Sequence, residues 1–286
     1  MDERPDVPGT GGEAPVPQNR SLAERLAART RISVPARHNP ALAAVIERAN
    51  EDAGLYALWI AQNVTAVDRL GMSDHGPVHV QIVANSALRL LRLLRDGGVR
   101  PGVVVDYGLT ELDAEVVVVL AALLHDVGMS IHREGHEAYS LFTAGPPLER
   151  LLRGLYGPAE ATVVRSEVLH AIIAHRAGGT PLTVEAGVLR VADALDMEQG
   201  RSRIPFEAGS TSIHAVSAAS IEDVSIEPGT ETPVRIRIRM SNSAGVYQVD
   251  KLLRDKLAGS GLEAWLSVEA RIEGDTEKRI VSDFRL

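Results

Sequence analysis

A histidine–aspartate pair closes the most apolar stretch of the chain. His125 and Asp126 come directly after the run Val116–Leu124, and Val127-Gly128-Met129 follows them. Histidine is the commonest metal ligand in proteins, and an ionised carboxylate at the end of so apolar a helix needs a strong partner. The pair therefore predicts a metal site inside a helical core. The alternative is a buried pair that only satisfies its own hydrogen bonds.

The other histidines gather around this pair. The chain has nine histidines, and seven of them fall within about a third of its length: His75, His79, His125, His132, His136, His170 and His175. Histidine binds metals and exchanges protons near neutral pH, so such clustering indicates a chemical role.

The spacing of His75 and His79 separates their roles. Gly76-Pro77 stands between them, and proline favours the first turn of a helix. His79 therefore lies in the first turn of the helix that follows, where its side chain can face a site. His75 lies at or before the helix start. We expect it to cap the helix or to contact a metal-binding side chain, and not to bind the metal itself.

Two further histidine pairs each offer one candidate. His132 and His136 are four residues apart, so one of them could reach a second metal, but the sequence HREGH is not the H-E-x-x-H of zinc peptidases. His170 and His175 are five apart, about 140° around a helix, so at most one of them faces the site. His175 is the better candidate, because it precedes a loop, and His170 is expected to be structural or to contact one of the metal-binding side chains.

A carboxylate completes the set of candidate ligands. Asp193 stands in the otherwise apolar segment Val191–Leu195, where a buried carboxylate needs a cation. Asp196 follows three residues later. It could point inward as well, or it could cap the helix or pair with Arg201 or Arg203.

The elements that must position these residues are mostly helices. Ser21 and Glu24 have the spacing of a capping box, and Thr110 and Asp113 suit a helix start. Apolar residues recur at helical spacing in a series of segments, and these are 41–48, 55–70, 78–94, 110–124, 137–142, 147–155, 159–175 and 183–197. The chain from 21 to about 204 is therefore predicted to be nearly all α.

The pattern changes after Arg203. Segments 219–226 and 233–240 alternate apolar and polar residues, which is typical of half-buried strands, and Pro228-Gly229 marks the turn between them. Segment 246–257 reads as an amphipathic helix. Strands are expected at 262–272 and 279–286, so the sequence predicts a β-β-α-β-β module.

Composition limits the class of protein. The net charge is −8, and no block rich in lysine or arginine is present, so binding to a nucleic acid backbone is not expected. The absence of cysteine excludes disulfides and thiolate zinc sites, which leaves histidine, aspartate and glutamate as metal ligands. No segment has the roughly 18 to 20 apolar residues of a membrane span, so we expect a cytoplasmic protein that binds no membrane.

The chain is expected to divide into three parts. Residues 1–19 are rich in proline, glycine and acidic residues and read as a disordered tail. Residues 20–204 form the helical metal-binding domain, and residues 205–286 form the smaller α+β domain. The strand edges of the second domain could form a homodimer.

The order of the candidate ligands resembles a known family. The segments DHGPVHVQIV, LAALLHDVGM and RVADALD carry His79, the pair His125-Asp126, and Asp193. Over roughly residues 70 to 200 the chain resembles the HD superfamily of metal-dependent phosphohydrolases. The resemblance implies a mainly α HD-domain bundle in which these four residues bind one divalent metal.

The resemblance also implies a second metal. GHEAYS supplies His136 and IIAHRAGGTP supplies His175, in segments similar to those that carry the extra ligands of two-metal members such as the HD-GYP phosphodiesterases. Met129 stands where the HD-GYP pattern has lysine, and no GYP tripeptide follows His175. Hydrolysis of cyclic di-GMP by the mechanism of that subgroup is therefore not expected.

The implied activity is hydrolysis of a small phosphorylated substrate, either a nucleotide, a cyclic nucleotide or another phosphate ester. We expect two divalent ions of Mn, Fe, Co, Ni or Zn, with Asp126 as the bridging catalytic carboxylate. An arginine would stabilise the phosphate charge, and Arg176 is the first candidate, before Arg201 and Arg203. The alternatives are a ligand sensor built on the same fold, in which the α+β module binds a ligand or partner, and a di-iron oxygenase.

Overall fold

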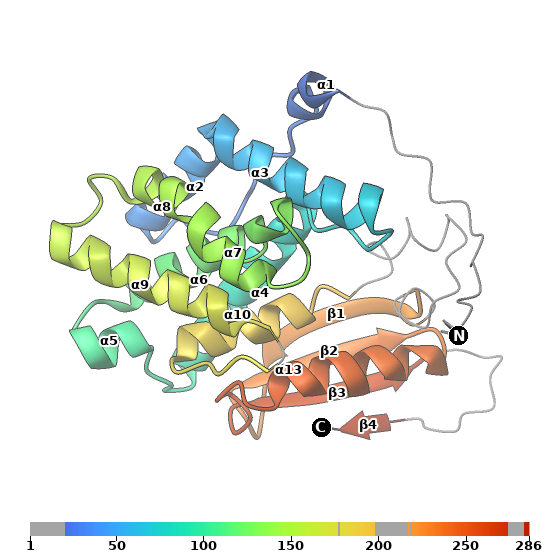
Figure 1. Ribbon diagram of the computed structural model, residues 1–286. Coiled ribbons are helices and arrows are strands. Elements are labelled where there is room, and N and C mark those ends of the chain that lie inside the picture. The colour runs from blue at the N-terminus through green and yellow to red at the C-terminus, as the bar shows by residue number, and fades with distance from the viewer. Residues whose placement is uncertain (1–20, 177, 198–216, 218, 274–282, 286) are drawn as a thin grey trace, which may run out of the picture.

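The computed structural model describes residues 21–176, 178–197, 217, 219–273 and 283–285. The predicted tail 1–19, the predicted domain boundary at 204/205 and the candidates Arg201 and Arg203 lie outside the described residues. The division into three parts therefore stays a prediction. The predicted fold class is confirmed: a helical bundle is followed by a smaller α+β module (Figure 1).

The bundle is built around one buried helix. Eleven of the fourteen residues of α6 (Glu111–Leu124) are buried, because the run of valines, leucines and alanines is apolar on every side. The surrounding helices are α1 (Leu22–Ala27), α2 (Pro40–Glu51), α3 (Ala53–Asn63), α4 (Pro77–Asp96), α5 (Gly102–Tyr107), α7 (His136–Thr143), α8 (Gly145–Leu152), α9 (Pro158–Ala174) and α10 (Val184–Ala194). A π-helix, Val64–Arg69, extends α3, and a 3₁₀ turn, Val127–Ser130, follows the histidine–aspartate pair.

Local signals explain where most helices begin. Ser21 with Glu24 and Thr110 with Asp113 form reciprocal capping boxes, as the sequence predicts. The short helix α5 was not predicted. Its first backbone N–H groups, at Gly102 and Val103, donate to the Glu185 carboxylate at 2.9 and 3.0 Å. The cap comes from a distant part of the chain, so the local sequence does not reveal it.

A buried charge network ties α6 to α4 and to the start of α2. The Arg92 guanidinium donates to both oxygens of Glu115 at 2.7 and 3.0 Å, and the Asn39 amide donates at 3.1 Å. Only 3% of the Glu115 side chain is exposed. Burial alone raises the pKa of Glu115, but these donors outweigh it and hold the pKa below its usual value near 4.5.

Glu115→Gln is expected to lower the free energy of unfolding at pH 7 by about 3 kcal/mol, because it leaves Arg92 without its counterion. The folded pKa of Glu115 is depressed, so the carboxylate stabilises the protein above pH 4.5 and loses this effect as the pH falls through the folded pKa. Urea titrations at pH 7 and near pH 3 should show the difference between variant and parent shrinking. Glu111→Gln, at an exposed position of the same helix, is the control.

The C-terminal module is a four-stranded sheet in the order β1-β2-β3-β4. The strands are β1 (Ile221–Pro228), β2 (Val234–Met240), β3 (Leu266–Ile272) and β4 (Asp283–Arg285). β1 and β2 are the predicted hairpin, whereas β2 and β3 pair in parallel. A parallel pair needs a crossover, and the predicted helix provides it as the π-helix Gln248–Leu253 followed by α13 (Arg254–Leu257).

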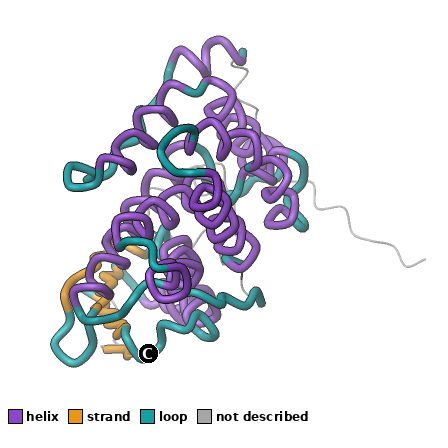
Figure 2. Tube along the Cα trace, turned by 90° about the vertical axis from the view of Figure 1, so that its left-hand side faces the viewer, coloured by secondary structure: helices purple, strands orange, loops and turns teal. Residues whose placement is uncertain are grey.

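The sheet occupies one end of the molecule, and the helices fill the rest (Figure 2). Along β2 and β3, alternate residues are buried. At the outer strand β1, the Arg89 side chain of α4 donates to the Ile226 carbonyl at 3.3 Å. The dimer through strand edges stays a prediction. Among the described residues, no helix has the length and apolar character needed to cross a membrane.

Candidate metal centre

The six predicted metal ligands meet in one place, although they come from five parts of the bundle. His79 lies in the first turn of α4, and His125 and Asp126 follow the end of α6. His136 begins α7, His175 follows α9, and Asp193 lies in the last turn of α10. Asp193 is partly buried, and the other five residues are buried.

His79 and His125 lie between one oxygen of Asp126 and one oxygen of Asp193. The Nε2 atoms of His79 and His125 are 3.2 Å apart. Each lies 3.6 Å from Oδ1 of Asp193. Oδ2 of Asp126 lies 3.6 Å from His79 and 3.4 Å from His125. Two ligands bound to one ion at about 2.1 Å lie roughly 3.0 to 3.4 Å apart, so small adjustments would close this set around one ion.

The remaining two histidines lie against the other oxygen of Asp126. Oδ1 of Asp126 is 3.0 Å from Nε2 of His136 and 3.7 Å from Nε2 of His175. The two Nε2 atoms are 3.3 Å apart. Asp126 therefore has one oxygen facing each histidine pair, which is the arrangement expected of a carboxylate that bridges two ions.

Acceptors on the far side of each ring orient all four histidines. Nδ1 of His79 donates to Asp196 Oδ2 at 2.5 Å, and the other three rings have backbone carbonyls within 3.0 Å of Nδ1: Ala122 for His125, Arg133 for His136 and Ile172 for His175. At His136 the Arg133 guanidinium, which can only donate, also lies 3.0 Å from Nδ1. On His79, His125 and His175 the carbonyl or carboxylate oxygen can only accept, so these contacts place the proton on Nδ1. Nε2 is then left with its lone pair facing the centre, as a metal ligand requires.

A serine fixes the turn that brings His125 and Asp126 to one site. Ser140 Oγ of α7 donates to the His125 carbonyl at 2.7 Å and accepts from the Gly128 N–H at 2.9 Å. Adjacent residues diverge by about 100° on a continuous helix. Here α6 ends at Leu124, so the backbone turns and both side chains reach the centre.

The charges of the centre call for a cation. Burial by itself raises the pKa of Asp126, but His125 and the neighbouring histidines outweigh it and hold the pKa well below its usual value. Burial by itself lowers the pKa of His125, but Asp126 and Asp193 raise it to about 10. Burial lowers the pKa of His175 to about 3. The ionised carboxylates attract a proton onto His125, and a divalent ion bound there would displace it.

This donor set fits divalent metal ions. Among the described residues, His79, His125 and Asp193 form one group whose ligand atoms could share an ion, and His125, Asp126 and His175 form another. Imidazole nitrogens with carboxylate oxygens suit Mn, Fe, Co, Ni and Zn, and they do not discriminate among them. These two groups contain five of the six predicted ligands and leave out His136, whose Nε2 lies 3.0 Å from Asp126. The ligand set and the role of each residue stay predictions.

Asp196 has a role that the sequence left open. It does not face the centre as a further ligand. Its carboxylate is 2% exposed and accepts from His79, which orients the imidazole from behind. The partner of Asp196 is 117 residues away in the sequence, so the local sequence could not assign this role.

Asp196→Asn is expected to weaken metal binding by about 10- to 100-fold, because the amide no longer holds His79 in the tautomer that exposes Nε2. Competition between the protein and a chelator for Mn²⁺ measures this affinity. Asp96→Asn, which changes an exposed carboxylate at the other end of α4, should bind Mn²⁺ like the parent. Equal Mn²⁺ affinities for the parent and Asp196→Asn would show that Asp196 does not orient His79 for metal binding.

The other predicted residues lie around the centre. The His75 ring is 5.2 Å from the His79 ring, and its Nδ1 donates to the Ser73 carbonyl at 2.7 Å. His132 is exposed, and His170 accepts from the Leu182 N–H at 3.0 Å. Arg176 pairs with Glu137 at 3.2 Å. These two residues directly follow the predicted ligands His175 and His136, so the pair lies beside the second half of the centre.

Lys256 was missed by the sequence analysis. It belongs to α13, yet its ammonium group donates to Asp193 Oδ2 at 2.7 Å and to the His175 carbonyl at 2.8 Å. The two partners precede it by 63 and 81 residues. No motif in the sequence points to this lysine.

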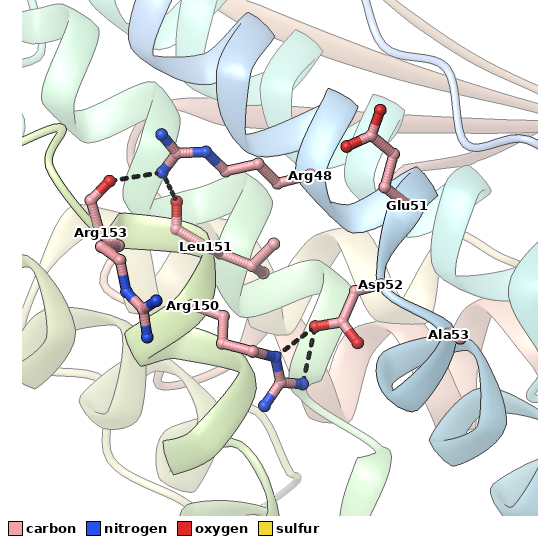
Figure 3. A pocket seen from close by; sticks show the side chains of 7 residues that line it. All are labelled: Arg48, Glu51, Asp52, Ala53, Arg150, Leu151 and Arg153. Atoms are coloured by element: carbon pink, nitrogen blue, oxygen red, sulfur yellow. Dashed lines mark hydrogen bonds and ion pairs between the residues drawn. The ribbon is translucent and has the colours of Figure 1, made fainter.

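A separate hollow of about 550 Å³ lies between the end of α2 and the end of α8 (Figure 3). Two of its three arginines are engaged within the protein. Arg150 donates to Asp52 at 2.7 Å, and Arg48 donates to the carbonyls of Leu151 and Arg153 at 2.8 and 2.7 Å. These contacts join the two helices, and none of the predicted ligands lines the hollow.

Comparison with known proteins agrees with this centre. Residues 78–198 match the HD domain family, a range that includes all six predicted ligands. The chain is also 44% identical over 211 residues to the uncharacterized protein MJ1020 of Methanocaldococcus jannaschii. The aligned region covers 74% of this chain and 82% of that protein. On its fold, its buried histidine–aspartate centre and these similarities, the chain belongs to the HD superfamily of metal-dependent phosphohydrolases.

Proposed function

We propose that the protein hydrolyses a small phosphate ester at a centre of two divalent metal ions. One observation carries this proposal: Asp126 turns Oδ2 toward His79 and His125, and Oδ1 toward His136 and His175. A carboxylate shared in this way is typical of two-metal phosphatases and phosphodiesterases.

The other five predicted ligands fall into two groups, one on each side of that carboxylate. His79, His125 and Asp193 would hold the first ion, and His136 and His175 the second. Bound divalent ions supply Lewis-acid chemistry, since they polarise phosphoryl oxygens and make water more acidic. The burial of five of the six ligands limits access of bulk water, which strengthens every charge interaction in the centre.

Arg176 is the proposed contact to the non-bridging phosphate oxygens. Its guanidinium pairs with Glu137 at 3.2 Å, and 46% of its side chain is exposed. A side chain so exposed can turn from Glu137 to an anionic ligand at little cost. In this role Arg176 would stabilise negative charge that develops during hydrolysis.

The substrate class follows from the charge of the centre. Two divalent ions with two carboxylates leave a net positive charge, which favours an anionic phosphate ester such as a nucleotide or cyclic nucleotide. The chain has only ten tryptophan, tyrosine and phenylalanine residues (2, 5 and 3), so few side chains are available to stack on a base. The choice among phosphate esters is therefore left to experiment.

The test is a hydrolysis assay on metal-reconstituted protein. The protein is stripped with a chelator, loaded separately with Mn²⁺, Fe²⁺, Co²⁺, Ni²⁺ or Zn²⁺, and given nucleotides, cyclic nucleotides and aryl phosphate mono- and diesters. We expect release of phosphate or of a nucleotide with at least one ion, and none after chelation. Binding of nucleotides without turnover would indicate a sensor, and consumption of dioxygen would indicate an oxygenase; either result contradicts the proposal.

A further inference from the structure

One charged side chain of the C-terminal module, that of Lys256, contacts the predicted metal centre. Lys256 Nζ lies 2.7 Å from Asp193 Oδ2 and 2.8 Å from the His175 carbonyl oxygen. Asp193 belongs to the predicted first half of the centre and His175 to the second. The ammonium group therefore lies beside both halves of the ligand set.

One side of α10 holds the segment that carries Lys256. At Gly187 the Ser260 carbonyl approaches so closely that a Cβ would overlap it. One turn later, the Arg190 guanidinium donates to the carbonyls of Asp255, Lys256 and Ala258 at 3.0, 2.8 and 2.9 Å. Asp193 follows three residues later and contacts Lys256 itself.

Arg190 acts as a clamp on the end of α13. The last carbonyls of a helix have no partners within the helix, and here a buried guanidinium satisfies them. The same side chain donates to the Gly179 carbonyl at 2.6 Å, which anchors the loop after His175. The ammonium of Lys256 is thus positioned by a built contact and does not hang from a free loop end.

Lys256 can make one more hydrogen bond. An ammonium group has three N–H donors, and within the part of the chain that the structure describes two of them are used. The side chain is 16% exposed, and Asp193 is 17% exposed beside it. The remaining donor is therefore next to the ligand set at a point that reaches solvent.

Charge indicates what that donor binds. A lysine beside proposed divalent ions adds positive charge to a centre whose two carboxylates do not balance it. Such an excess is stable when an anion enters, and a phosphate oxygen accepts strongly from an ammonium group. Lysine commonly serves phosphates in this way, as a point charge.

We propose that Lys256 binds a phosphate oxygen of the substrate, so that the C-terminal module contributes a substrate-binding residue to the centre. This inference rests on the proposed phosphohydrolase function. It explains why the crossover of the sheet ends against α10. It also makes the module part of the substrate site, in addition to any role it has in binding other molecules.

The test compares Lys256→Met, Lys256→Gln and Lys256→Arg with the control Arg254→Met. Arg254 lies on the same helix, is half exposed and pairs with Asp250 at 2.7 Å, so its change removes one positive charge away from the centre. Each full-length protein is loaded with Mn²⁺, and its Mn²⁺ content is measured. Binding of inorganic phosphate is followed by calorimetry, and kcat and KM are measured on the substrate found in the hydrolysis assay.

We expect Lys256→Met and Lys256→Gln to keep their Mn²⁺ and to bind phosphate about 10- to 100-fold more weakly, with a matching rise in KM, because a charged hydrogen bond is lost. Lys256→Arg should recover most of the affinity, and Arg254→Met should match the parent. Phosphate binding unchanged in Lys256→Met would overturn the inference. Loss of Mn²⁺ from both Lys256→Met and Lys256→Gln would also overturn it, since Lys256 would then position Asp193 only.

Failure of the proposed function gives a different result. In that case the parent protein itself would hold no Mn²⁺ and hydrolyse nothing. Phosphate binding by the metal-free parent, compared with metal-free Lys256→Met, then tests the lysine alone. A parent that hydrolyses its substrate while Lys256→Met does so with the same KM would contradict only the role of Lys256.

Discussion

Asp126→Ala is expected to abolish both metal binding and hydrolysis, with a fall in turnover of about 10³-fold or more. The reason is that this one carboxylate faces both halves of the centre: one oxygen lies 3.4 Å from Nε2 of His125, and the other lies 3.0 Å from Nε2 of His136. Removing it takes a ligand from both halves of the centre at once. Metal content by mass spectrometry and initial rates of hydrolysis measure the two effects separately.

His132→Ala is the matched control for this variant. His132 lies between the predicted ligands Asp126 and His136 in the sequence, but its side chain is exposed. Its Nδ1 accepts a hydrogen bond from the Glu134 N–H at 3.1 Å. The control should keep its metal and its rate. An Asp126→Ala protein that is folded and retains either full metal content or full turnover would show that the carboxylate has another role.

Gly128→Ala is expected to lower the free energy of unfolding by more than about 4 kcal/mol and to remove the second half of the centre. A Cβ at this position would overlap the His136 carbonyl and the Ser140 backbone N, well inside the 3.0 Å that real Cβ atoms keep. Both neighbours are backbone atoms of α7, so they cannot move aside alone. The helix that carries His136 would have to shift.

Urea titration measures the loss of stability, and metal content reports on the second half of the centre. Gly145→Ala is the control, because among the described residues no atom beyond the adjacent backbone lies within 4 Å of its added Cβ, and α8 begins there. The control should be as stable as the parent or slightly more so. A Gly128→Ala protein as stable as Gly145→Ala would contradict the close approach of α7 to the 3₁₀ turn.

Much of the fold was predictable because its signals are local. The apolar run of α6, the capping box of Thr110 and Asp113, and the alternation in β1 and β2 each depend on neighbouring residues. The predicted ligands met in the structure because each stands at a helix end or in a first or last turn. Helix ends can be read from caps and prolines, and the order of ligands along the chain resembles a known family.

The parts that were missed depend on distant residues. Helix α5 is capped by Glu185, and Lys256 reaches Asp193 across 63 residues. Local sequence patterns indicate whether a segment forms a helix or a strand. They do not indicate which side chains of two distant segments come into contact. For the same reason, the sequence named Asp193 as the candidate ligand but left the role of Asp196 open, since its contact with His79 spans 117 residues.

The parallel pairing of β2 and β3 was also not predictable from the strand pattern. Alternation of apolar and polar residues specifies which face of a strand is buried, and it is the same for parallel and antiparallel neighbours. The crossover helix decides the direction. Its packing against α10, through Arg190 and Lys256, is a tertiary contact.

A crystal structure of the Mn²⁺-loaded protein, with its anomalous signal, would show whether the histidine–aspartate centre binds two metal ions. We expect two anomalous peaks, one bound by His79, His125, Asp126 and Asp193, and one bound by Asp126, His136 and His175. A single peak restricted to one group would contradict the dinuclear centre. Peaks only outside these residues, or none after full loading, would contradict the assignment of the histidine–aspartate pair as a metal site.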